Sequence, residues 1–136
     1  MKKKKIVICA SASFGNEIIE WKNKLEIFGF EVIKYPTKIQ EDFLKGYKKE
    51  FSEHYEAIFK ADIVLVLNLD KKEISGYIGA GVFAEMAFAI GLNRGFNKKI
   101  EICYINPIPE ATMPYSDELK LWQELKWIKL FEIPKI

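Results

Sequence analysis

The sequence predicts a single α/β domain in which a doubly wound parallel sheet carries helices on both faces. Strand-like and helix-like segments alternate along the whole chain, which is the pattern of such a sheet. The predicted strands are short, continuous apolar runs, as is typical of strands that are buried on both faces. The 136 residues contain no repeat, linker or low-complexity segment, so residues 1–136 are expected to form one domain around one core.

The first half of the chain predicts two strands, each followed by a helix. Residues 5–10 (KIVICA) are the first strand. The helix after it places four apolar side chains on one face, those of Ile18, Trp21, Leu25 and Phe28. Gly29 ends that helix, and a second strand at residues 31–35 ends at Pro36. Between residues 39 and 60 a second helical face is formed by Phe43, Tyr47, Phe51, His54 and Ile58.

The second half predicts three more strands and two helices. Residues 62–67 (DIVLVL) form the most apolar strand, which favours a central place in the sheet. A helix follows at residues 81–92 and a strand at residues 100–105. After a proline-containing loop at residues 106–115 come a helix at residues 116–125 and a last strand at residues 128–133. Five strands in this alternation favour a flavodoxin-like or Rossmann-like sheet of order 2-1-3-4-5.

Composition limits the classes of partner and the compartment. The net charge is only +2 and Arg94 is the single arginine, so we expect no nucleic-acid partner. Cys9 and Cys103 lie in apolar strand patterns, which indicates small buried side chains in a reducing compartment. The apolar run after the lysines at residues 2–5 is too short for a signal peptide, and no segment approaches the length of a membrane span. We therefore expect a cytoplasmic protein that has no membrane partner.

Two polar loops are expected to meet where the strand order reverses. Residues 11–16 (SASFGN) follow the first strand and residues 68–79 follow the third, and open parallel sheets bind ligands at that point of their carboxyl edge. Both loops lead into helix N-termini, which favour anions. The first loop is equally compatible with an ordinary strand-to-helix turn. It lacks the threonine and glycine density of a flavin phosphate loop, and the chain has no dinucleotide or P-loop motif, so no cofactor is expected.

Glu85 is the candidate catalytic group. It lies about one turn after Gly81 in a predicted helix, and its neighbours in the sequence are valine, phenylalanine, alanine and methionine. An unpaired buried charge is costly, so core packing does not account for a glutamate at this position. Its side chain is expected to point toward the helix N-terminus, where the helix dipole would keep it ionised and nucleophilic. The alternative is a surface glutamate that begins a polar stripe, but its neighbours form no such stripe.

A motif around Glu85 resembles a known family. The pattern AD–apolar strand–loop–GxGxxxExxxA runs from Ala61 through Gly79, Gly81 and Glu85 to Ala89. It resembles the nucleoside 2-deoxyribosyltransferase family, including the related 2'-deoxynucleoside 5'-monophosphate N-glycosidases. The resemblance extends to the serine-bearing first turn and to the length and order of elements. Two segments typical of one branch, YIG and an NPIPE-like segment, stand at residues 77–79 and 106–110.

The resemblance implies that Glu85 attacks the anomeric carbon of a (deoxy)nucleoside or nucleotide. The resulting glycosyl-enzyme ester is then resolved by water or by a second base, so the bond is hydrolysed or transferred with retention. No cofactor or metal is implied. Family self-association and the aromatic residues of the helix at residues 39–60 predict a homodimer or higher homo-oligomer. The expected substrate-binding residues are Ser11, Ser13, Asn68, Tyr77, Gly79 and Gly81.

Two departures from the family pattern leave alternatives open. His54 stands where the family usually has an aspartate, and it is interpreted either as the proton donor to the leaving base or as a core histidine. Ser13 replaces a basic residue of the phosphate-binding relatives, which argues against a 5'-monophosphate substrate.

His54 has no cysteine or carboxylate partner at ligand spacing, so no metal site is expected. Asp62 is interpreted as structural. The alternatives to an enzyme are a non-catalytic nucleoside-binding or nucleotide-binding module and, less favoured, an interaction domain without a small ligand.

Overall fold

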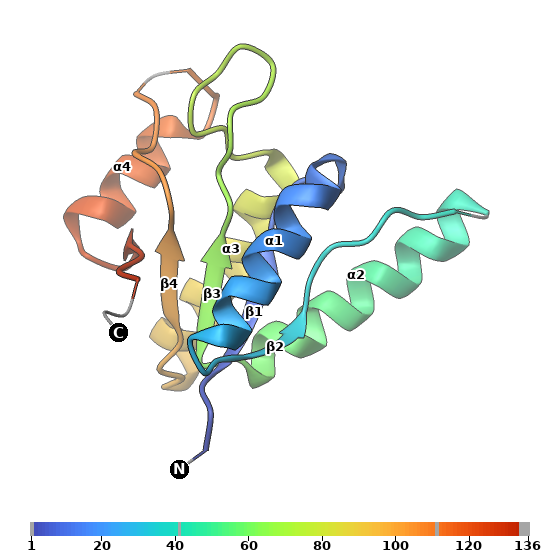
Figure 1. Ribbon diagram of the computed structural model, residues 1–136. Helices are drawn as coiled ribbons and strands as arrows, with labels where there is room; N and C mark the ends of the chain where they lie inside the picture. Colours follow the sequence, from blue (N-terminus) through green and yellow to red (C-terminus); the bar gives the residue numbers. More distant parts are fainter. Residues whose placement is uncertain (1, 41, 111, 134–136) are drawn as a thin grey trace.

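The five strands form one parallel sheet of order β2-β1-β3-β4-β5, as the sequence predicts (Figure 1). The computed structural model describes residues 2–40, 42–110 and 112–133. The strands are β1 (Lys5–Cys9), β2 (Glu31–Lys34), β3 (Ile63–Val66), β4 (Glu101–Tyr104) and β5 (Lys129–Leu130). The helices are the short 3-10 helix η1 (Ala12–Phe14), α1 (Gly15–Ile27), α2 (Phe43–Lys60), α3 (Ala80–Phe96) and α4 (Ser116–Glu124).

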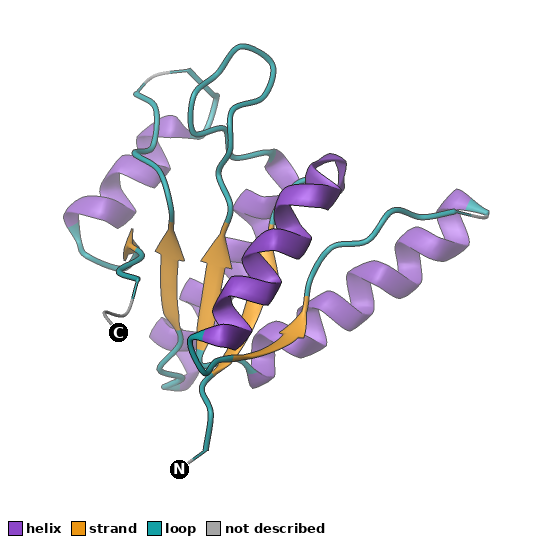
Figure 2. Ribbon diagram, in the orientation of Figure 1, coloured by secondary structure: helices purple, strands orange, loops and turns teal. Residues whose placement is uncertain are grey.

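The helices cover the two faces of the sheet unequally (Figure 2). The chain passes from β1 to β2 in one direction across the sheet and then crosses back three times in the other. Right-handed crossovers therefore place α1 on one face and α2, α3 and α4 on the other. The apolar clusters agree with this arrangement. Ile18 and Leu25 of α1 belong to the same cluster as Ile8, whereas Met86 of α3 belongs to the opposite cluster with Val7.

The centre of the sheet sets the position of the loops. β1 pairs with β2 on one side and β3 on the other, and Cys9 stands in register with Val66. The loops that follow β1 and β3 therefore leave the sheet side by side, at the point where the strand order reverses. Asp62 lies at the opposite edge, where its Oδ2 accepts the backbone N–H of Lys5 at 2.8 Å. This contact agrees with a structural role for Asp62.

Several element boundaries differ by a few residues from the predicted ones, and two of these differences have an identifiable cause. The last strand has two residues and not six. The backbone N–H groups of Ile105 and Asn106, just beyond β4, donate to Asn68 Oδ1. β4 therefore ends early and offers β5 only a short partner. Helix α3 continues to Phe96, beyond the predicted end at residue 92. Its end is set by Asn97, which adopts a left-handed conformation with φ of 58°. The glycine at position 91 does not stop the helix.

Helix α2 is buried against the rest of the domain only over its second half. Among the five residues of its predicted face, only His54 and Ile58 are buried. Phe43, Tyr47 and Phe51 are 64%, 50% and 45% exposed, because this half of α2 extends beyond the edge of the sheet (Figure 1). α2 is the longest helix, yet within the residues that the structure describes no helix is both long and apolar enough for a membrane crossing.

Candidate active site

A cavity of about 220 Å³ opens at the carboxyl edge of the sheet, between the ends of β1 and β3. This is the place that the predicted strand order indicates. Its wall is formed by the turn after β1, the loop at residues 68–79 and the first turns of α3. Five of the residues singled out from the sequence line it together: Ser11, Tyr77, Gly79, Gly81 and Glu85.

Glu85 lies in this wall with a histidine and a cysteine behind it. Its Oε1 is 3.6 Å from Nε2 of His54, and that nitrogen is 3.3 Å from Sγ of Cys9. His54 is contributed by α2, Cys9 by the last position of β1 and Glu85 by α3. Cys9 and His54 are buried, whereas the Glu85 side chain keeps 19% of its surface exposed. His54 has no cysteine or carboxylate partner at ligand spacing along the sequence, but the fold brings both kinds of group to it.

Burial controls the protonation of this cluster. It raises the pKa of Glu85 to about 7, and a hydrogen bond with the Cys9 thiol opposes that rise. The expected effect of the helix dipole, which would keep Glu85 ionised, is weak at this position, because Glu85 is the sixth residue of α3 and the dipole acts mainly on the first turn. Desolvation is the larger effect here.

The same burial changes the interpretation of His54. Desolvation, assisted by the charge of Lys34, lowers the pKa of His54 to about 4. A neutral imidazole accepts a proton and is a poor proton donor, so the pKa does not favour the role of acid toward a leaving base. His54 is also not among the residues that line the cavity. It instead stands behind Glu85 as a neutral imidazole, with Nε2 at 3.6 Å from the carboxyl oxygen.

Lys71 is a site residue that the sequence reasoning missed. Its Nζ donates a hydrogen bond to Ser11 Oγ at 2.7 Å, and Ser11 Oγ lies 2.8 Å from Ser13 Oγ. The ammonium also lies 5.9 Å and 6.0 Å from the ring centroids of Phe14 and Tyr77. The wall of the cavity therefore carries a cation beside two hydroxyl groups, in a half-buried setting. Lys71 and Lys72 are the only basic residues in the loops 11–16 and 68–79, and this is the sequence feature from which a cation at the site could have been predicted.

A tight turn holds Lys71 in this position. Lys71 and Ile74 exchange backbone hydrogen bonds of 3.1 Å and 2.9 Å around two central residues. Those residues, Lys72 and Glu73, have φ values of 53° and 61°, which is the geometry of a two-residue hairpin turn. Such turns favour asparagine and glycine, so the residue types gave no sign of it.

Asn68 supports the site from below instead of facing a ligand. Its side chain is fully buried, and its amide donates to the backbone oxygen of Asn106 at 2.7 Å and of Gly76 at 3.4 Å. Its Oδ1 accepts the N–H groups of Ile105 and Asn106. Each polar atom of Asn68 therefore has a protein partner, so the expected direct contact with a substrate does not agree with this structure. The side chain ties the loop after β3 to the loop after β4.

The two predicted glycines differ in their surroundings. A Cβ added at Gly81 would meet no atom within 4 Å, so this position leaves open space in the cavity wall. A Cβ at Gly79 would lie 3.4 Å from the ring of Tyr77, which is an ordinary contact. Ser13 is exposed and reaches the cavity through Ser11. The demand for glycine is greatest at Gly76, where φ is +69° and an added Cβ would lie 2.4 Å from the backbone oxygen of Pro107.

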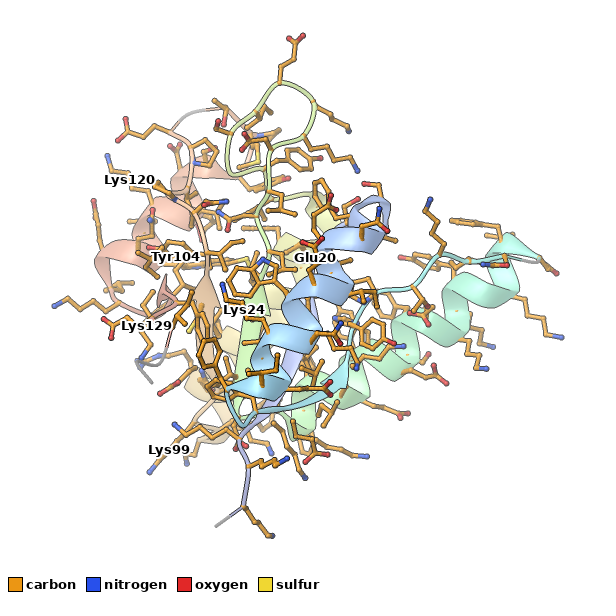
Figure 3. All side chains as sticks on the ribbon, in the orientation of Figure 1. Glu20, Lys24, Lys99, Tyr104, Lys120 and Lys129 are labelled. Atoms are coloured by element: carbon orange, nitrogen blue, oxygen red, sulfur yellow. The ribbon has the colours of Figure 1, made fainter. Side chains whose placement is uncertain are left out.

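A larger cavity of about 350 Å³ lies at the opposite edge of the sheet. Five cationic side chains line it: Arg94, Lys98, Lys99, Lys126 and Lys129. Figure 3 shows Lys99, from the lining of this cavity, at the end of β4 opposite to Tyr104. The one carboxylate in its lining, that of Glu101, is 3.7 Å from Lys129. Because ligands of open parallel sheets bind at the carboxyl edge, we place the candidate site in the smaller cavity.

The sequence matches no protein-family model, and no curated protein is significantly similar to it. The resemblance through the motif around Glu85 therefore stays a prediction. The site itself combines a carboxyl group, a neutral imidazole, hydroxyl groups and a lysine around one cavity. These groups suit nucleophilic or acid–base chemistry on a small ligand that carries negative charge.

We predict that Glu85→Gln makes the free energy of unfolding more dependent on pH than it is in the unaltered protein. A carboxyl whose pKa rises from 4.5 to about 7 on folding takes up a proton between these values, so stability increases as the pH falls. A histidine whose pKa drops from 6.5 to about 4 loses a proton on folding, so stability decreases as the pH falls. The two effects oppose each other, and the substitution leaves only that of His54.

Urea unfolding in metal-free buffer between pH 4.5 and 6.5 measures this change. The variant is expected to lose up to about 1.4 kcal/mol per pH unit as the pH decreases, relative to the unaltered protein. Glu20→Gln, on the exposed surface of α1, is the matched control and is expected to leave the profile unchanged. Parallel pH profiles for the Glu85 variant and the unaltered protein would contradict the opposed shifts.

Proposed function

We propose that the protein is a cytoplasmic enzyme that cleaves or transfers the N-glycosidic bond of a (deoxy)nucleoside or nucleotide. The observation that carries this proposal is Glu85 in the wall of the carboxyl-edge cavity, with the buried His54 3.6 Å from its Oε1. This carboxyl group faces the cavity, where it can meet a ligand, and a neutral imidazole lies directly behind it. The motif that joins Ala61, Gly79, Gly81 and Ala89 to Glu85 supports the same function.

The proposed reaction uses the carboxylate as nucleophile. The Glu85 carboxyl loses its proton to solvent, because His54, with a pKa of about 4, is a weaker base than a carboxylate whose pKa is about 7. An oxygen of the resulting carboxylate attacks the anomeric carbon. The bond between that carbon and the base nitrogen breaks, its electron pair leaves with the base, and the base takes up a proton from solvent. Water or a second base then displaces Glu85 from the ester, which restores the carboxylate. His54 acts through Glu85 and is a positioning residue in this scheme, because its uncharged ring lies against the carboxyl.

Lys71 supports a substrate that carries a phosphate. Ser13 stands where phosphate-binding relatives have a basic residue, but the structure brings the Lys71 ammonium to the same turn through Ser11. Among the described residues no carboxylate lies within ion-pair distance of Lys71. A cation with two hydroxyl groups beside it suits a phosphate, whose oxygens accept several charge-assisted hydrogen bonds. We therefore favour 5'-monophosphates over nucleosides as substrates.

A non-catalytic binding module is the second candidate. It is favoured by the pKa of Glu85, because a carboxyl that titrates near 7 is partly protonated at neutral pH and is then not a nucleophile. The same cavity, lysine and hydroxyl groups would still hold a nucleotide. Base release separates the two candidates, since binding without release supports the module.

We predict that Glu85→Gln lowers the rate of base release by roughly a thousandfold or more while nucleotide binding persists. Loss of a nucleophile removes the covalent step, whereas the amide keeps the size of the side chain. Chromatography of free base, after incubation with a panel of nucleosides and their 5'-monophosphates, measures the rate, and calorimetry measures binding. Glu20→Gln, labelled in Figure 3 on α1, is the control. Equal release by the Glu85 variant and the unaltered protein would exclude Glu85 as nucleophile.

We predict that Lys71→Met lowers kcat/KM for 5'-monophosphates by roughly 10-fold to 100-fold, the worth of a charge-assisted hydrogen bond. For the corresponding nucleosides, which lack the phosphate, the change is expected to stay within about threefold. The comparison uses initial rates of base release for each nucleoside and its monophosphate. Lys72→Met is the matched control, because Lys72 is the exposed neighbour in the same turn. An equal loss for both substrate classes would remove the phosphate role of Lys71.

We also propose that the protein forms a homodimer through the exposed face of α2. Rings stack along this face from Phe43 through Tyr47 and Phe51 to Tyr55, with centroid distances of 6.1, 5.8 and 4.2 Å. Three of these four side chains are among the exposed large apolar residues, and Leu44 beside them is 77% exposed. An aromatic helix face of this kind is more often covered than left in water.

We predict that Tyr47→Glu, which places a charge in the middle of this face, converts the dimer to a monomer. Sedimentation equilibrium at micromolar concentration measures the change. The matched control is Ile27→Glu, because Ile27 is 80% exposed and lies on α1, which covers the other face of the sheet. A monomer in the unaltered protein, or dissociation by both substitutions alike, would contradict an interface on α2.

A further inference from the structure

Three different metal-ligating groups meet beneath the cavity. Cys9 Sγ, His54 Nε2 and a carboxylate oxygen of Glu85 all lie within 4.8 Å of one another. They come from a strand and two helices that are far apart in the sequence. The contact between Cys9 and His54 is 3.3 Å and that between His54 and Glu85 is 3.6 Å. The nucleophilic role of Glu85 uses neither the thiol of Cys9 nor the convergence of all three groups.

We propose that this cluster binds a Zn²⁺ ion and that the bound ion prevents Glu85 from acting as the nucleophile. The binding site stands independently of the proposed function, whereas the inhibition rests on it. Earlier expectations of no metal site depended on ligand spacing along the chain, but the ligands here are brought together by the fold. Thiolate, imidazole and carboxylate are the donors that structural and catalytic zinc sites use.

Two of the three separations in the cluster match those of a zinc centre. A tetrahedral ion with bonds of about 2.3 Å to sulfur and about 2.0 Å to nitrogen and oxygen places sulfur and nitrogen about 3.5 Å apart. The same ion places nitrogen and oxygen about 3.3 Å apart. The observed separations of 3.3 Å and 3.6 Å differ from these values by only a few tenths of an ångström. The third pair, Cys9 Sγ and the Glu85 carboxylate oxygen, lies within 4.8 Å, so a rotation of the Glu85 side chain toward the sulfur would complete the site.

The charges in the cluster also fit a dication. A Cys9 thiolate and a Glu85 carboxylate together carry two negative charges, which neutralise Zn²⁺ in a setting where an unbalanced charge would be costly. His54 ligates as neutral imidazole, the form that burial favours. Ion binding releases the thiol proton of Cys9, and the carboxyl proton of Glu85 where present, to the buffer, and no group is oxidised.

The cavity supplies access and a fourth ligand. Glu85 is the one member of the cluster that lines it, so an ion reaches the buried sulfur and nitrogen from that side. Three protein ligands with one position open to water are the arrangement of catalytic-type zinc sites. A carboxylate bound to a dication is a far weaker nucleophile, because the ion withdraws electron density from both oxygens. Metal occupancy therefore suppresses glycosyl transfer through Glu85.

The test titrates Co²⁺ into the full chain after removal of metal by a chelator. The expected result is one ion per chain with the near-ultraviolet absorption of a thiolate–cobalt bond, which Zn²⁺ displaces. Cys9→Ala is expected to abolish this absorption, and His54→Gln to weaken binding by more than roughly a hundredfold, since even outer-shell partners are worth 10-fold to 100-fold. Cys103→Ala is the matched control, because Cys103 is also a free, buried cysteine on a strand.

Each outcome decides one part of the proposal. Absence of the thiolate–cobalt absorption at saturating Co²⁺ in the unaltered protein, or its loss in the Cys103 variant alone, overturns the site. Circular dichroism of each metal-free variant shows whether it is folded, and His54→Gln gives a second test if Cys9→Ala is not. Base release with and without Zn²⁺ is then compared within each variant. If Zn²⁺ inhibits base release by the unaltered protein but not by Cys9→Ala, the result supports the proposal that the bound ion prevents Glu85 from acting as the nucleophile.

The two proposals fail in distinguishable ways. If no substrate is cleaved, the cobalt titration still decides the metal site, because it needs no activity. If bases are released and Co²⁺ does not bind Cys9, the metal site is excluded and the glycosidic function stands. If Co²⁺ binds and Zn²⁺ leaves the rate of base release unchanged, the site is retained and the inhibition is excluded.

Discussion

The burial of one carboxyl group between β1, α2 and α3 is the constraint on which the candidate site depends. Desolvation raises the pKa of Glu85 to about 7 and lowers that of His54 to about 4, so between these pH values Glu85 is the protonated member and His54 is neutral. Because the carboxyl keeps 19% of its side chain exposed to the cavity, this desolvated group still meets a ligand.

The loops around the cavity depend on a second buried polar group. Asn68 forms four hydrogen bonds to backbone groups in two loops, and Gly76 allows those loops to approach closely. Tyr115 adds a hydrogen bond from its hydroxyl to the backbone oxygen of Ile78. With this frame fixed, the 71–74 turn holds Lys71 against Ser11. The position of the cation is thus determined by backbone contacts more than by the lysine itself.

The order of the sheet and the location of the cavity were predictable, because both follow from alternating apolar periodicity and from the rule for open parallel sheets. The cluster of Cys9, His54 and Glu85 was not, since these residues are far apart in the sequence and meet only through side-chain direction on packed elements. Lys71 was missed because its turn uses lysine and glutamate at positions with positive φ. Asn68 was assigned to the substrate because polar residues near a strand end resemble ligand contacts until their burial is known. The family resemblance and the reaction stay predictions.

Glu85 decides how the two proposed uses of the site relate to each other. It is the single member of the cluster that also faces the cavity. A metal ion bound with Cys9 and His54 therefore alters the carboxylate that a substrate in the cavity meets, and a substrate bound to Glu85 alters the carboxylate that the ion meets. Removing its proton favours both uses, because a nucleophile and a metal ligand each need the carboxylate. The thiol of Cys9 separates them, since it contributes to metal binding and does not line the cavity. A glycosidase that needed only Glu85 and His54 would retain its chemistry with a smaller apolar residue at position 9, whereas a metal site would not.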